Sequence, residues 1–88
     1  MSVHALVWAW RQKVGHPTRK LVLVALADEV IADDGECWPS LERIAEFAEC
    51  DVRTVQRHID VLMEEGFVQW CQHYQGYRLP HADNATHS

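Results

Sequence analysis

Apolar residues in the middle of the chain recur at intervals of three and four, in two separate sets. The sets are Leu41, Ile44, Ala45 and Ala48, followed by Val52, Val55, Ile59, Leu62 and Met63. This spacing places each set on one face of a helix and predicts helices over residues 41–48 and 52–65. Asp51 is placed to accept hydrogen bonds from the first N–H groups of the second helix, and Ser40 can do so for the first. The pattern therefore predicts two short helices joined by a tight turn.

The same spacing predicts two further helices upstream. An apolar stripe over residues 3–14 consists of Val3, Leu6, Val7, Trp10 and Val14. Gly15 and Pro17 break this helix, and the next runs to about residue 32. It is apolar on most sides, which predicts a central core helix. Trp8, partly off the stripe, and Trp10 either pack on the domain or belong to a dimer or partner interface, and the sequence leaves both interpretations open.

Short strands are predicted around and after these helices. Cys37 and Trp38 form a very short strand, residues 67–73 alternate as a strand does, and residues 77–79 return after a tight turn at 74–76. Residues 81–88 are polar and without periodicity, which predicts a disordered tail. We therefore expect one domain over residues 1–80 and a tail over 81–88.

Length and composition fit one small domain. The chain has 88 residues, of which 48% are hydrophobic. No apolar run approaches the roughly 20 residues needed to cross a bilayer, and no basic region precedes the first apolar residues as in a secretion signal. Three cysteines without a CxxC pair favour reduced thiols. These features predict a cytoplasmic protein without a membrane contact.

The sequence contains no recognisable catalytic or metal-binding arrangement. Cys71 and His73 lack CxxC or HxxxH spacing, and residues 33–36 lack the spaced ligands of a calcium loop. There is no glycine-rich phosphate loop, no GxSxG and no evident pair of carboxylates in a pocket. We expect a protein that is not an enzyme, with no metal, no cofactor and no evident small-molecule substrate.

Charge is segregated along the chain. The net charge of −5 argues against indiscriminate binding of nucleic acid, which favours a basic surface. Residues 1–20 carry four basic and no acidic side chains, whereas residues 21–49 carry eight acidic side chains against Arg43. A locally positive face therefore remains compatible with the acidic total.

Residues 41–68 resemble the helix-turn-helix of winged-helix DNA-binding domains, whose usual form is roughly Leu-Ala-x-x-x-Gly-Val-Ser-x-x-Thr-Val-x-Arg-x-Leu-x-x-Leu-x-x-x-Gly-Leu-Ile. The matching residues are Ile44, Ala45, Cys50, Asp51, Thr54, Val55, Arg57, Ile59, Leu62, Gly66, Phe67 and Val68. The resemblance extends over about residues 21–79 and includes modules of phage and plasmid replication initiators and small phage-borne regulators. One position departs: the family usually has glycine where this chain has Glu49. Either the turn differs, or Glu49 adopts a left-handed conformation at a cost of roughly 1 kcal/mol.

The resemblance implies a winged helix-turn-helix: mainly α, with a three-helix core, an additional N-terminal helix and a small β-hairpin wing in a three-stranded sheet. Residues 52–65 would form the recognition helix in the major groove. Its polar side carries the candidate base-reading residues Arg53, Thr54, Gln56 and Arg57. Candidate contacts to the DNA backbone are Lys20, Ser40, Arg43 and Arg78, with Tyr74 and Gln75 on the wing. The alternative for each is an ordinary solvated side chain.

The sequence thus predicts sequence-specific binding of double-stranded DNA, in transcriptional regulation or replication initiation. A second hypothesis is an acidic winged-helix protein-interaction module, a phage-encoded modulator of a replication, repressor or host-defence protein. Glu42, Glu46 and Glu49 on the first turn-linked helix favour it, as do the N-terminal tryptophans. A homodimer or a protein partner held by the N-terminal helix is compatible with either.

Overall fold

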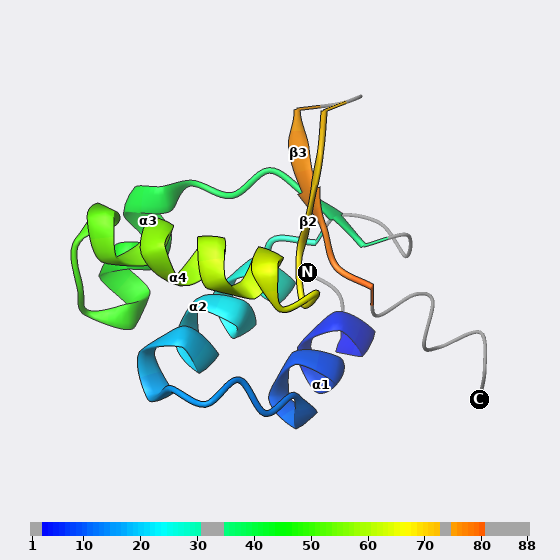
Figure 1. The fold of residues 1–88 in the computed structure, drawn as a ribbon, viewed down its shortest axis with the longest axis horizontal. Helices are drawn as coiled ribbons and strands as arrows, with labels where there is room; N and C mark the ends of the chain where they lie inside the picture. Colours follow the sequence, from blue (N-terminus) through cyan, green and yellow to red (C-terminus); the bar gives the residue numbers. More distant parts are fainter. Residues whose placement is uncertain (1–2, 31–34, 73–74, 81–88) are drawn as a thin grey trace.

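In the described part of the chain, three helices pack around a fourth, the second in sequence, and three short strands form a sheet at one end of the molecule (Figure 1). The computed structural model describes residues 3–30, 35–72 and 75–80. In chain order the elements are α1 (Val3–Arg11), α2 (Pro17–Asp28), β1 (Glu36–Cys37), α3 (Leu41–Ala48), α4 (Val52–Glu64), β2 (Gln69–Cys71) and β3 (Gly76–Arg78). The mainly helical fold with a small antiparallel sheet confirms the predicted fold class.

The boundaries of α3 and α4 follow their caps. Ser40 precedes α3, and its Oγ accepts a hydrogen bond from the backbone N–H of Arg43 at 3.4 Å. Asp51 precedes α4 in the same role. α3 has the predicted bounds, and α4 ends one residue before the predicted Glu65, which follows it as the C-cap. Local sequence therefore defines both helices of the turn-linked pair.

The two upstream helices are shorter than predicted. α1 ends at Arg11, and the Lys20 amine binds the backbone carbonyl oxygens of Trp10 and Gln12 just at that end. α2 ends at Asp28, and two residues later Val30 pairs with Cys37 in an isolated antiparallel bridge. The predicted helical residues 31–32 lie outside the described residues.

The core is centred on α2. Its fully buried members include Val22, Leu23, Leu26, Ile44, Val55, Ile59, Leu62, Val68 and Leu79. The apolar stripe predicted over residues 3–14 is only partly buried, with Val14 5% exposed and Leu6 packed in part against the core. Ala5 and Ala9 are fully buried, whereas Val3 is 67% and Trp10 75% exposed. Small alanine side chains let the α1 backbone approach α2 closely, which turns the larger residues outward.

Val52 is a second correction on burial. It was predicted to face inward with Val55, Ile59 and Leu62, but it is 38% exposed. It occupies the first position of α4, directly after the turn. Trp8, in contrast, packs half-buried against the core, so Trp10 is the outward tryptophan of α1.

The sheet has the order β1-β3-β2, with both pairings antiparallel. Glu36 and Gln69 flank Arg78 on its two sides, and Trp70 lies opposite Tyr77. β1 and β3 each begin one residue before the predicted ranges, and β2 is the middle part of the predicted strand 67–73. Gln75 has a positive φ of 56° in the turn before β3. His73, Tyr74 and the predicted tail 81–88 lie outside the described residues.

In the part of the chain that the structure describes, no helix is long and apolar enough to cross a membrane.

Candidate nucleic-acid interface

The start of α4 is held by its cap. Asp51 Oδ1 accepts a hydrogen bond from the backbone N–H of Thr54 at 2.7 Å. Hydrogen bonds from Thr54 hold the pKa of the Asp51 carboxyl below its ordinary value of 3.8, and nearby Arg53 and Arg57 act in the same direction. The cap thereby fixes the first turn of α4, on which Arg53 stands.

The turn between α3 and α4 is left-handed at Glu49. Its φ is 56° and its ψ is 46°, and its N–H binds the backbone carbonyl oxygens of Ala45 and Glu46. The Cys50 N–H also binds the Ala45 carbonyl oxygen, at 3.0 Å. The turn therefore has the shape that the family gives to glycine, and Glu49 adopts it with the associated strain.

The outward side of α4 begins basic and ends acidic. Arg53 and Arg57 are exposed on the side opposite to the buried Val55, Ile59 and Leu62. Farther along the same side lie Asp60 and Glu64, also exposed. The first two turns can therefore meet an anionic surface, whereas the last turns would repel it.

One edge of α4 lies beside the sheet. Gln56 is half-buried, and its Nε2 donates to Asp60 Oδ1 at 3.0 Å. Its side chain also lies near the Tyr77 phenol of β3. Burial raises the pKa of Tyr77, and Gln56 opposes that shift. Gln56 therefore lies where α4 meets the wing in this structure, a placement that sequence reasoning missed.

The other edge of α4 meets the start of α2. His58 is half-buried, its Nδ1 accepts from Arg19 Nε at 3.4 Å, and its ring centroid lies 4.7 Å from that of His16. Partial burial, together with His16 and Arg19, lowers the pKa of His58. Arg19 Nη1 also donates to the Val14 carbonyl oxygen at 2.9 Å. Arg19 was not among the predicted site residues. Its position in the first turn of α2 was the sequence signal that could have found it.

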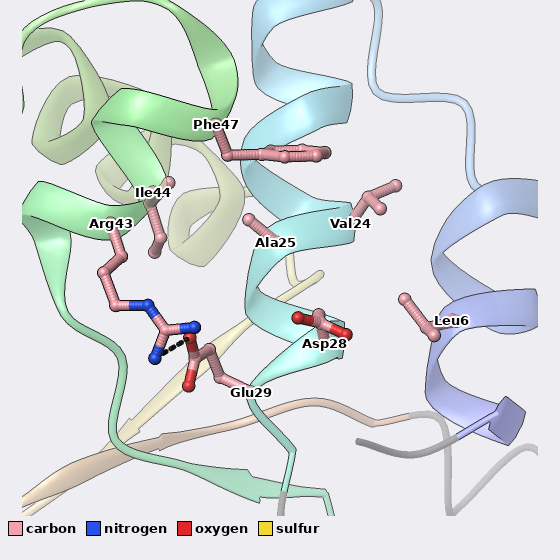
Figure 2. Close-up of a pocket in the computed structure, with 8 residues that line it drawn as sticks. All are labelled: Leu6, Val24, Ala25, Asp28, Glu29, Arg43, Ile44 and Phe47. Atoms are coloured by element: carbon pink, nitrogen blue, oxygen red, sulfur yellow. Dashed lines mark ion pairs between the residues drawn. The ribbon is translucent and has the colours of Figure 1, made fainter.

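The four candidate backbone contacts come from α2, from the start of α3 and from β3. The Lys20 amine is engaged at the end of α1, and Ser40 Oγ donates to Glu42 Oε2 at 3.3 Å. Arg43 forms an ion pair with Glu29 of α2, Nη1 to Oε1 at 3.5 Å (Figure 2). Arg78 is half-buried in β3, between its neighbouring strands. To contact phosphate, each of these side chains would either keep its internal contact or exchange it for the phosphate.

The described part of the wing presents aromatic side chains. Trp70 and Tyr77 form an edge-to-face pair with ring centroids 5.1 Å apart, and Trp38 is also partly exposed. Gln75 Nε2 donates to the Gln72 carbonyl oxygen at 3.1 Å and thereby closes the turn. The other predicted wing residue, Tyr74, lies outside the described residues.

A groove lies between α1, α2 and α3, away from the candidate DNA contacts on α4. It has a volume of about 380 Å³, and Figure 2 shows Leu6, Val24 and Phe47 around it. The sequence-based prediction did not include Phe47. The signal that could have found it was a large apolar side chain outside the apolar set of α3.

Within residues 3–30, 35–72 and 75–80, no three His, Cys, Asp or Glu side chains are grouped as metal ligands would be. Cys37 is fully buried, and burial, followed by the charge of Glu29, raises the pKa of its thiol to about 12. Cys37 therefore stays a protonated core side chain.

A family model described as a helix-turn-helix domain matches residues 16–68. The match begins at the residue that caps α2, includes α3 and α4, and ends just before β2. Neither a curated protein nor a solved structure matches the chain.

Proposed function

The chain belongs to a family of helix-turn-helix domains, and on this premise we propose that it binds double-stranded DNA with the first two turns of α4 in the major groove. The observation that carries the proposal is the exposure of Arg53 and Arg57 on the outward side of a capped helix. Their position explains how a chain of net charge −5 can still present cations to a phosphate backbone.

We assign the base-reading role to Arg53, Thr54, Gln56 and Arg57. An arginine can donate two hydrogen bonds to guanine, and a glutamine can pair with adenine in a similar way. Arg53 and Arg57 are the leading readers because they are exposed. Gln56 would read a base by exchanging its bond to Asp60, and Thr54 would contact phosphate or a thymine methyl group.

Contacts to the DNA backbone would come from Lys20, Ser40, Arg43 and Arg78, and wing contacts from Tyr74 and Gln75. The domain would comprise residues 1–80, with 81–88 as a tail. The biological setting would be transcriptional regulation or replication initiation, in the cytoplasm, as for the phage and plasmid modules that the sequence resembles.

The test is a selection of bound duplexes from random DNA, followed by affinity measurements on the preferred and a scrambled site at several salt concentrations. We expect Arg57→Ala to lose about 1–3 kcal/mol of binding free energy on the preferred site and less on the scrambled one. Lys13→Ala, which removes an exposed cation outside α4, is the matched control and should leave the preference unchanged.

Two outcomes would contradict these assignments. An equal loss on every sequence would remove Arg57 from the reading role. Binding to no duplex, even at low salt, would overturn DNA binding itself, because phosphate contacts strengthen as salt falls.

The exposed apolar side chains of α1 favour a second candidate, a module that binds protein. Val3 and Trp10 are largely exposed, and α3 presents Glu42 and Glu46 to solvent. An acidic winged-helix domain that modulates a replication, repressor or host-defence protein would use these surfaces and would show no salt-dependent binding of DNA.

A further inference from the structure

The outer side of α1 is apolar but not buried. Val3, Leu6, Val7 and Trp10 are spaced as one helical face, which we call the α1 stripe. Val7 is 44% exposed, and Val3 and Trp10 are more so, whereas the helix packs on α2 through Ala5 and Ala9. α1 therefore has two apolar sides, and only one of them is covered by the described residues.

The α1 stripe continues into the groove between α1, α2 and α3. Leu6 belongs to both, and Figure 2 shows its side chain directed from α1 toward Val24 of α2, with Phe47 of α3 above. Phe47 is 53% exposed, and Leu21 lies one turn before Val24 on the same side of α2. Stripe and groove together form one surface, the α1–groove face.

The size of this face suits a protein interface. Since an aromatic side chain offers about 150–250 Å², the exposed fractions of Trp10 and Phe47 amount to roughly 250 Å². With Val3, Val7 and Leu21 the apolar area is on the order of 500 Å², toward the upper end of the range for the largest patch on a monomer. A standard interface buries about 800 Å² per partner, rather more than half of it apolar.

The α1–groove face is basic at one end and acidic at the other. Lys20 binds carbonyl oxygens at the end of α1, which places the exposed Arg11 and Lys13 beside the start of α2. At the opposite end, Asp28 is exposed beside Leu6, and Glu29 forms an ion pair with Arg43. A two-fold axis through the face would place the basic end of one copy against the acidic end of the other.

We propose that the occupant of this face is a second copy of the chain. In the two-fold dimer the α1 stripes pack antiparallel, Trp10 of each copy enters the partner's groove beside Phe47, and Arg11 faces the partner's Asp28. A two-fold interface must be self-complementary, and a face that is apolar in the middle with opposite charges at its ends meets that requirement.

The dimer leaves α4 accessible, whereas Arg43, which lines the groove, would be covered and could contact DNA only in the monomer. Arg19, which reaches His58 of α4, and Asp28 lie nine residues apart in α2, which places them on about opposite sides of that helix. The two copies of α4 would therefore point away from each other, toward separate DNA segments rather than adjacent turns of one straight duplex. Dimerisation itself requires no DNA and does not depend on the proposed function.

Sedimentation equilibrium of the full chain without DNA, from micromolar to near-millimolar concentration, tests the dimer. We expect a monomer–dimer equilibrium that Trp10→Ala weakens at least tenfold. Trp70→Ala, which removes a partly exposed tryptophan from the wing, should leave it unchanged. A wild-type chain that stays monomeric over the whole range, or equal weakening by both substitutions, would overturn the proposal.

Charge reversal tests the antiparallel arrangement. Arg11→Glu and Asp28→Lys should each weaken the dimer several-fold, and the double variant should recover most of the loss because both reversed contacts are again opposite in sign. Both side chains are exposed, so folding should be retained, as circular dichroism can verify. Additive losses in the double variant would contradict this pairing of ends.

Discussion

At the residue scale, Glu49 shows strain where the fold needs a particular backbone shape. A left-handed conformation brings the Cβ of a non-glycine residue close to the following carbonyl oxygen. Glu49 nevertheless adopts it, because the sharp turn lets Ala45 and Ala48 of α3 and Val55 of α4 bury their side chains together. The packing of the two helices outweighs the strain of one residue.

Glu49→Gly should therefore stabilise the domain. Removing roughly 1 kcal/mol of strain, against about 0.4–1 kcal/mol for the more flexible unfolded chain, predicts a free energy of unfolding higher by up to about 0.5 kcal/mol. Glu46→Gly, the same change inside α3, is the control and should lower it by about 0.5–1 kcal/mol. Urea denaturation measures both, and destabilisation by Glu49→Gly would contradict the strain.

At the element scale, α4 is defined by its cap and oriented by its two edges. Asp51 fixes the first turn, Gln56 lies near Tyr77 of β3 at one edge, and His58 contacts Arg19 of α2 at the other edge. These contacts leave the side with Arg53 and Arg57 as the accessible one. Contacts at its start and along both edges hold α4 in place, so the orientation of its outward side does not depend on a flexible segment.

The Asp51 cap predicts a dependence of stability on pH. The pKa of Asp51 is lowered in the folded protein, so its contribution is present above the unfolded value and is lost as pH falls through the folded value. Asp51→Ala should lower the melting temperature at pH 7, and the difference from wild type should shrink below about pH 4. Asp51→Asn keeps a cap without the titration and should reduce the pH dependence specifically. A difference that stays constant down to pH 2 would exclude this role for the carboxylate.

At the scale of the whole molecule, α2 connects everything else. It contacts α1, α3 and α4, and its buried side chains Val22, Leu23 and Leu26 form the middle of the core. The α1–groove face and the outward side of α4 lie on different sides of this helix. Two surfaces of different chemistry can therefore coexist on a small domain.

The substitution Leu26→Ala tests how much the stability of the domain depends on the packing of α2. The fully buried leucine would leave a cavity and cost about 2–5 kcal/mol, a large part of the stability of a small domain. Leu21→Ala, on the exposed side of the same helix, should cost less than about 1 kcal/mol in dilute protein. Thermal denaturation compares the two, and similar losses would contradict the central role of α2.

The sequence by itself determined what depends on neighbouring residues. It predicted the bounds of α3, the caps Ser40 and Asp51, the hairpin and the mainly helical fold, because spacing and capping act over three or four residues. The DNA-contact roles of Arg53, Thr54, Gln56 and Arg57 stay predictions.

Only the tertiary structure decided which sides are covered. The periodicity of α1 is that of a helix, but Ala5 and Ala9 allow a closer approach to α2 than the larger stripe residues do, so most of the stripe stays exposed. The partners of Lys20 and Arg43 come from other elements, so no local pattern encodes them. Burial and pairing across the fold are set by how elements meet, whereas the elements themselves are set by residues a turn apart.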